Sequence, residues 1–169
     1  MLLKKTLLAA AMVALGGFAA SAAGSTATTN FKVTLTITST CSVATGTPAD
    51  ITFGSQPSTA TALAASNSIS VNCSTGTPYD IGLLPTNTGG TALGTGNLLT
   101  SDSKSADSIP YKLFQDSLST KAWGNTVGTN TLHDTGTGGP VSKTVYATIA
   151  SADFTPDSYT DTVDVTVTY

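Results

Sequence analysis

The chain has 169 residues, with seven lysines, ten aspartates and neither Arg nor Glu, so its formal net charge is −3. Nucleic acid is not expected as a partner, because phosphate binding requires clustered cations. Thr, Ser and Gly are abundant and good helix formers are few outside the first residues, a composition typical of strands joined by turns. The sequence therefore predicts an all-β protein.

Residues 1–23 have the pattern of a secretion signal. Two lysines precede an apolar run, and small residues supply a cleavage site after Ala22 or Ala23. A membrane anchor is disfavoured because the run is shorter than the ~20 residues that a spanning helix needs and contains Gly16 and Gly17. Cleavage leaves about 146 residues, enough for one domain with a core, and a net charge of 5 − 10 = −5.

The first strand predicted after the signal is also the most regular. Residues 30–37 alternate apolar and polar side chains without interruption, and a strand sends alternate side chains to opposite faces. The apolar face consists of Phe31, Val33, Leu35 and Ile37. One face of this segment therefore has to be buried, either in its own domain or in another molecule.

Cys41 and Cys73 are the only cysteines. Export from the cytoplasm allows them to oxidise, which favours one disulfide over two buried free thiols. A zinc site would need more ligands than two cysteines and the single histidine, His133, supply.

Short strands are expected to follow along the chain. Alternation and turn residues predict strands at 49–53, 68–73 and 79–83, with a loop at 59–65. A Thr-Gly-Thr-Pro turn at 75–78 separates the second and third of these strands, so we expect them to form a hairpin.

The second half of the chain is expected to contain three strands. Residues 85–108 and 125–140 are rich in Thr, Asn, Gly and Ser and are expected to be mainly connections. Strands are predicted at 109–116, 141–149 and 159–169. About seven strands separated by turns indicate a two-sheet antiparallel sandwich. The first and last strands carry few of the charges, prolines or bulges that normally protect sheet edges, which indicates assembly.

No catalytic, cofactor-binding or metal site is predicted. The Asp134-Thr135-Gly136 signature of aspartic proteases occurs once, in a Gly-rich loop, whereas that mechanism needs two carboxylates. His133 beside Asp134 has no nucleophile-elbow sequence with it. Paired carboxylates for sugar hydrolysis are set by folding rather than by spacing, so the sequence leaves that possibility open.

Four stretches stand out in chain order: CSTGTPY at 73–79, YKLFQD at 111–116, WG at 123–124 and YTDTVDVTVTY at 159–169. Together, and in this order, they resemble the spore coat protein U domain family, the subunits of archaic (Csu-type) chaperone-usher pili. Family members commonly have Tyr in place of Phe114 and Gly in place of Ala147 and Asp157. These departures leave the expected fold unchanged.

The resemblance implies an incomplete immunoglobulin-like sandwich, completed when another molecule donates a strand. Residues 24–38 would be the donor strand and residues 39–169 the spore coat protein U, or pilin, domain. The anchors of the donor strand would be Phe31, Val33, Leu35 and Ile37. The wall of the acceptor groove, which also binds the chaperone, would consist of Val163, Val165, Val167 and Tyr169.

The resemblance also implies partners and a destination. The partners would be identical or homologous pilin subunits, a periplasmic chaperone and an outer-membrane usher. The chain would be a non-enzymatic subunit of a surface fimbrium that serves adhesion and biofilm formation. Two alternatives stay open: a secreted spore or cyst coat protein with the same domain, and a secreted carbohydrate-binding β-sandwich module.

Overall fold

The computed structural model describes residues 24–45, 50–87, 89–100 and 106–169, and the predicted secretion signal lies outside these ranges. The chain divides into two units, Met1–Thr36 and Ile37–Tyr169. All strands found among the described residues belong to the second unit. Within the described ranges, no helix is long and apolar enough to cross a membrane.

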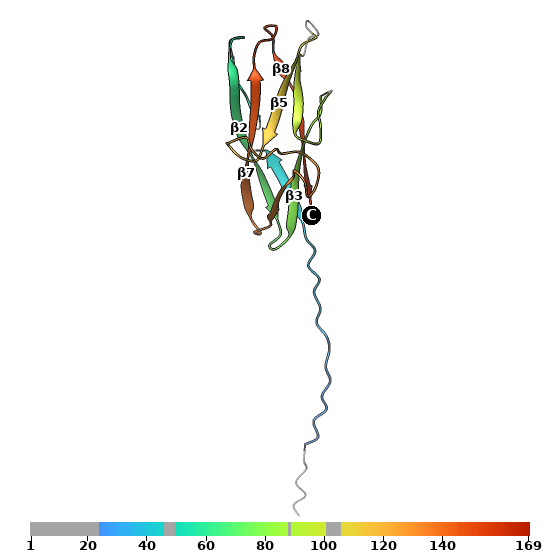
Figure 1. Cartoon of the computed structure of the whole chain (residues 1–169). Coiled ribbons are helices and arrows are strands. Elements are labelled where there is room, and N and C mark those ends of the chain that lie inside the picture. Colours follow the sequence, from blue (N-terminus) through green and yellow to red (C-terminus); the bar gives the residue numbers. More distant parts are fainter. Residues whose placement is uncertain (1–23, 46–49, 88, 101–105) are drawn as a thin grey trace, which may run out of the picture. The chain divides into compact units, whose positions relative to one another are not determined.

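Six strands form the larger sheet, and every neighbouring pair in it is antiparallel (Figure 1). Its centre is the long ladder between β2 and β7, in which Thr61 pairs with Ser151 and Asn72 with Pro140. In spatial order the strands are β1 (Cys41–Thr45), β2 (Thr61–Cys73), β7 (Pro140–Ser151), β5 (Ser108–Phe114), β4 (Thr95–Thr100) and β8 (Tyr159–Thr160).

Three antiparallel strands form the smaller sheet, with β3 in the middle. They are β6 (Leu132–Thr135), β3 (Pro78–Pro85) and β9 (Val163–Thr168). In β9, Val alternates with polar residues, and the valines are more buried than their neighbours. Strand β9 is therefore an edge strand whose apolar face packs toward the core.

The core lies between the sheets and draws side chains from both. Ile81 and Leu83 of the small sheet are almost completely buried, as are Val71 and Leu113 of the large sheet. Trp123 is also fully buried, although it lies on the connection between β5 and β6. The full set of buried apolar residues is Ile69, Val71, Cys73, Tyr79, Ile81, Leu83, Ile109, Tyr111, Leu113, Trp123, Val145, Ala147 and Ile149.

The predicted disulfide is present. Cys41 and Cys73 are bonded to each other, and they are directly opposite in the register of β1 and β2. Cys41 is the first residue of β1 and Cys73 the last of β2. The bond therefore ties the start of the second unit's first strand to the central ladder of the large sheet.

The all-β antiparallel sandwich that the sequence predicts is confirmed, but the predicted hairpin is wrong. The strand ending at Cys73 belongs to the large sheet and the strand beginning at Pro78 to the small one. The turn between them contains Gly76 at a φ of 77°, a left-handed conformation that suits glycine. The Gly76 amide donates to the carbonyl of Gly136 at 2.8 Å, so this turn changes sheets instead of closing a hairpin.

Several other boundaries differ from the prediction. The predicted loop at 59–65 contains the start of β2, and β4 and β6 occupy stretches expected to be connections. Residues 50–53 are the described part of the predicted strand at 49–53, and they belong to no strand. The last predicted strand is divided into β8 and β9. The division occurs at Asp161, whose carboxylate accepts hydrogen bonds from Asn87 and Tyr111.

Candidate interaction cleft and N-terminal segment

A cleft of about 1160 Å³ lies within the second unit, between the two sheets. Its apolar lining comes from the inner face of the large sheet, from strands β3 and β9 of the small sheet, and from two loops. The apolar residues that line it, apart from prolines, are Ile51, Phe53, Leu63, Ile69, Leu83, Leu98, Ile109, Tyr111, Leu113, Val145, Ala147, Ile149, Ala152, Phe154, Tyr159, Val163 and Val165. An apolar cleft of this volume between two sheets is suited to alternate side chains of an extended peptide.

One rim of the cleft is the loop before β2. Ile51 and Phe53 of this loop are only partly buried, and both pack against the core. The side-chain amide of Asn67 on β2 donates to the carbonyl of Asp50 at 2.8 Å, and that of Gln56 donates to the carbonyl of Phe53 at 2.7 Å. These bonds hold the loop beside the cleft without pairing it to a sheet.

A second part of the lining follows β7. Phe154 packs against the core from this segment, and the amide of Thr155 donates to Oδ2 of Asp107 at 2.9 Å. Hydrogen bonds from Thr155 lower the pKa of the Asp107 carboxyl. The cleft is thus lined by sheet residues at its base and by hydrogen-bonded loops at its margin.

Tyr111 and Asp161 both line the cleft and are bonded to each other. The Tyr111 hydroxyl donates to Oδ2 of Asp161 at 2.8 Å. Oδ1 of Asp161 accepts from the amides of Asn87, at 3.0 Å, and Thr162, at 2.7 Å. Burial and then the bond to Asp161 raise the pKa of Tyr111 well above its usual range. This carboxylate therefore fixes the point at which the chain leaves β8 and begins β9.

The four residues predicted to form a groove wall differ in position. Val163 and Val165 line the cleft, and Val167 packs against the core without lining the cleft. Tyr169 follows the end of β9 and is 59% exposed. Within the described residues, β9 has a strand partner on one side only, β3. The free edge of β9 and the cleft therefore adjoin along Val163 and Val165.

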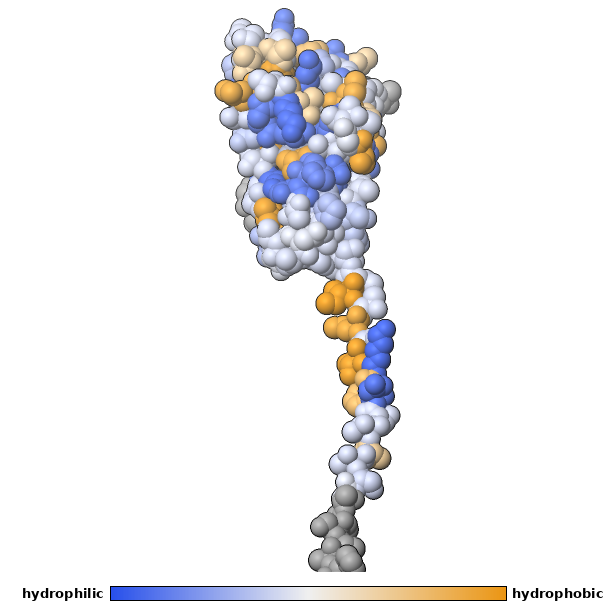
Figure 2. Space-filling model, turned by 60° about the horizontal axis from the view of Figure 1, so that its bottom comes forward, coloured by the Kyte–Doolittle hydropathy of each residue, from blue (hydrophilic) through white to orange (hydrophobic). Residues whose placement is uncertain are grey.

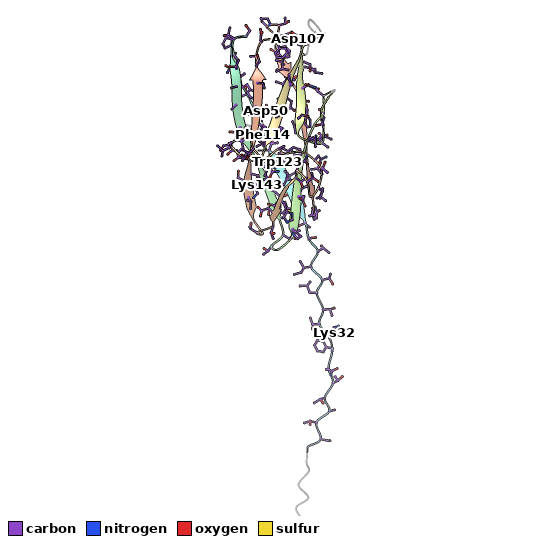
Figure 3. The ribbon with its side chains drawn as sticks, in the orientation of Figure 1. Lys32, Asp50, Asp107, Phe114, Trp123 and Lys143 are labelled. Atoms are coloured by element: carbon purple, nitrogen blue, oxygen red, sulfur yellow. A yellow bond between two sulfur atoms is a disulfide. The ribbon has the colours of Figure 1, made fainter. Side chains whose placement is uncertain are left out.

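The N-terminal segment, residues 24–38, contains neither strand nor helix. Its four apolar side chains are between 82% and 87% exposed: Phe31, Val33, Leu35 and Ile37. Figure 2 shows apolar residues gathered along one side of this extended segment and hydrophilic residues along the other. Lys32, labelled in Figure 3, is the only charged residue between 24 and 40. Such an apolar face is normally found buried.

A family model, the Spore Coat Protein U domain, matches residues 27–166. The chain belongs to this family. The match confirms the resemblance inferred from the sequence and spans both the N-terminal segment and the cleft. Among curated proteins no match is found.

The spore coat protein U domain also resembles a solved chain in "Crystal structure of CsuC-CsuE chaperone-tip adhesion subunit pre-assembly complex from archaic chaperone-usher Csu pili of Acinetobacter baumannii". The TM-score is 0.54 at 19% identity, and the alignment covers 79% of this chain and 40% of that one. The present chain thus corresponds to less than half of that chain's length. This likeness supports the fold.

Two ion pairs involve the small sheet of this spore coat protein U domain: one lies on its outer face, and the other links it to the large sheet. Asp80 on β3 accepts from Thr131 Oγ1 at 2.8 Å and lies 3.3 Å from Nδ1 of His133. Asp134 on β6 pairs with Lys143 on β7, and the hydroxyl of Tyr79 donates to the same carboxylate oxygen at 3.5 Å. His133 therefore interacts with Asp80 and not with its sequence neighbour.

Asp134, considered above because of its Asp-Thr-Gly sequence, is occupied by structural contacts. The hydrogen bond from Lys143, and then that from the amide of Thr135, lower the pKa of the Asp134 carboxyl. Desolvation and the neighbouring Asp134 raise the pKa of Tyr79. No group of three or more potential metal-ligating side chains occurs among the described residues.

Sequence reasoning did not identify several cleft residues. Leu63 lies in a predicted loop, and Phe154 lies between predicted strands. Ile51 and Phe53 lie in a predicted strand that the structure does not contain, but their spacing of two residues correctly indicates that both side chains pack against the core. The rim could have been predicted from single large apolar residues within otherwise polar segments, because such side chains are more often buried than exposed.

Proposed function

We propose that this spore coat protein U domain is a structural, non-enzymatic pilin subunit that polymerises by donating its N-terminal segment to the cleft of the next subunit. The observation that carries the proposal is the coexistence of two unsatisfied apolar surfaces in one chain. They are a cleft of about 1160 Å³ at a sheet edge and a segment whose four apolar side chains are at least 82% exposed.

The two surfaces match in form. An added strand gains main-chain hydrogen bonds from a free edge and gains specificity from alternate side chains that enter pockets. The edge of β9 is free among the described residues, and Val163 and Val165 lie beside it in the cleft. Residues 27–37 span roughly 36 Å when extended, which is enough to cross the cleft beside a six-residue strand of about 20 Å.

The expected energy is adequate for a stable joint. Four anchors at ~1.5 to 3 kcal/mol each contribute roughly 6 to 12 kcal/mol before the cost of ordering the segment. This equals the stability of a whole domain, about 5 to 15 kcal/mol. A one-residue slip would direct Lys32 and the threonines into the cleft, so the register of insertion is strongly specified.

The proposal includes the partners and destination inferred from the sequence. Until the next subunit arrives, the exposed cleft needs a temporary occupant, and we assign that role to a periplasmic chaperone. The solved complex supports this assignment because it is described as a chaperone and subunit before assembly. An outer-membrane usher would then exchange the chaperone for the next donor segment, and the product would be a surface fimbrium used in adhesion and biofilm formation.

A second candidate is deposition as a spore or cyst coat, which the family's description favours. Both functions use the same joint between subunits and differ in the product. Electron microscopy of the producing cells separates them, since a pilin gives thin fibres that extend from the surface and a coat protein gives a layer.

The test is assembly in bacteria that also produce the chaperone and usher of the same system. Surface extracts of the wild type should give heat-resistant ladders in gel electrophoresis and fibres in micrographs. Val33→Asp or Leu35→Asp should abolish both and leave the subunit able to accumulate with its chaperone, because a carboxylate in the cleft is buried without a partner.

Thr34→Asp is the matched control. It introduces the same charge between the two anchors but on the opposite face of the segment, where the side chain stays in solvent. Fibres should therefore persist in this variant. Normal fibres from Val33→Asp and Leu35→Asp would refute the proposed function.

A further inference from the structure

Lys32 is the only charge in the exposed segment at 24–38 and lies on its polar face, between the anchors Phe31 and Val33 (Figure 3). If the anchors enter the cleft of a second copy, Lys32 points to the outer face of that copy's small sheet. This inference rests on the proposed function and concerns what Lys32 meets on that face.

We assume full overlap, in which all four anchors lie opposite all four residues of the predicted wall, because a shift by two residues keeps the same face inward but leaves at least one anchor beyond the wall. Full overlap allows two alignments. The four apolar residues 31, 33, 35 and 37 can be set against 163, 165, 167 and 169 in antiparallel or in parallel order. The antiparallel order places Lys32 beside Thr168, whereas the parallel order places it beside Asp164. Every strand pair in the described sheets is antiparallel, and parallel pairs are slightly less stable per residue. We therefore take the antiparallel order.

The antiparallel order brings Lys32 into line with a carboxylate. Thr168 of β9 pairs directly with Asp80 of β3. Asp80 lies on the outer face, because its neighbour Ile81 is fully buried in the core. A donor strand beside β9 would therefore produce a row of Lys32, Thr168 and Asp80 across three strands. Two strand spacings, about 9 to 10 Å, separate the ends of this row, and the long lysine side chain can cross the short threonine between them.

The Asp80 carboxylate is held in a defined position for such a contact. Thr131 donates to one of its oxygens at 2.8 Å, and the His133 ring lies 3.3 Å from the other. The side chain retains 18% exposure. An ionised carboxylate accepts up to about four hydrogen bonds, so its oxygens have capacity for a further donor.

We infer that Lys32 of one copy pairs with Asp80 of the next across Thr168, and that this pair specifies the direction and register of the inserted segment. Its partner surface is the outer face of the small sheet of a second copy of this chain. The apolar anchors supply most of the affinity, and the charge pair discriminates between alignments that bury the same anchors.

Cysteine pairs in the full chain test the alignment. Fibres carrying Lys32→Cys with Thr168→Cys should form an intersubunit ladder on oxidation that reducing agent removes, because directly opposite residues lie within disulfide distance. Lys32→Cys with Asp164→Cys is the matched pair for the parallel order and should give no ladder. A ladder from the second pair, or from neither pair in intact fibres, overturns the inference and leaves the proposed function standing. Absence of wild-type fibres would instead refute the proposed function.

A double-mutant cycle tests the ion pair itself. Lys32→Met and Asp80→Asn should each accelerate dissociation of fibres in detergent by up to about fivefold, the range of partly exposed pairs. The double variant should be no faster than the faster single variant, and high salt should reduce the difference from wild type. Asp164→Asn is the control and should act independently of Lys32→Met. Independent effects of Lys32→Met and Asp80→Asn would overturn the pairing.

Discussion

The Tyr111 hydroxyl donates to Oδ2 of Asp161 at 2.8 Å, which joins the centre of the large sheet to the residues where the chain passes to the small sheet. The ring of Tyr111 lies against Gly96 so closely that a Cβ at Gly96 would come within 2.5 Å of it. The direction of β9, and hence one wall of the cleft, therefore depends on a contact between a tyrosine and an aspartate 50 positions apart.

Tyr111→Phe should lower the free energy of unfolding by about 1 to 3 kcal/mol, because Asp161 loses a partner in a partly buried site. Urea unfolding followed by tryptophan fluorescence measures the change. Tyr146→Phe is the control on the neighbouring strand β7 and should stay within ~0.5 kcal/mol of wild type. Equal stabilities of Tyr111→Phe and wild type would show that the bond contributes nothing.

Gly96→Ala should destabilise the domain at the same contact by a different route. The added methyl group would displace the Tyr111 ring from its position over β4 and weaken the bond to Asp161. We expect a loss of about 1 to 3 kcal/mol, the usual cost of overpacking. In the background of Tyr111→Phe the additional loss should be smaller than in the wild type, since the bond is already absent. Urea unfolding of the wild type, the two single variants and the double variant shows whether the two losses of stability are coupled or simply add.

Trp123 is the only tryptophan, is fully buried, and donates from Nε1 to the carbonyl of Ile81 at 2.8 Å. Trp123→Phe removes this donor and part of the buried ring, and should cost about 2 to 4 kcal/mol. Because the change also removes the fluorophore, unfolding is followed by circular dichroism. The wild-type emission should shift to longer wavelength when the chain unfolds, and emission that is already solvent-like in the native protein would contradict the burial of this side chain.

The alternation of apolar and polar residues predicts the strands that bury large apolar side chains on one face. It does not predict the strands that are held mainly by backbone hydrogen bonds to their neighbours. Ile69, Val71 and Cys73 revealed the second half of β2, whereas its first half has few large apolar residues and is specified by the ladder to β7. Strands β4 and β6 were missed for the same reason. The change of sheet at Asp161 depends on contacts with Asn87 and Tyr111, which no local pattern reveals. The exposed anchors were identified because period alone defines them.

Removal of the disulfide should destabilise the domain strongly. The bond joins residues 32 positions apart, and the chain-entropy model assigns a loop of this size about 3.5 to 4 kcal/mol. The variant with both Cys41→Ser and Cys73→Ser should therefore unfold at lower urea concentration than the oxidised wild type. Reduction of the wild type should reproduce the shift, and reducing agent should have no effect on the double variant. A wild type that is insensitive to reduction would contradict the expected contribution.

The pair of Asp134 and Lys143 should make part of the stability depend on pH. The hydrogen bond from Lys143 lowers the pKa of Asp134, so the folded state holds this proton less tightly than the unfolded state, whose pKa is about 3.9. The contribution is complete above that value and is lost as the pH falls through the lower, folded pKa. Lys143→Met should thus destabilise the domain near neutral pH by less than ~1 kcal/mol.

The difference between Lys143→Met and wild type should shrink as the pH is lowered from 7 to about 3, because protonated Asp134 no longer attracts the lysine. Urea unfolding at several pH values measures it. Lys112→Met is the control, since Lys112 is exposed on β5 and belongs to neither ion pair. Its effect should not vary with pH in this range. A difference for Lys143→Met that grows in acid would show that Lys143 contributes through packing or through another charge.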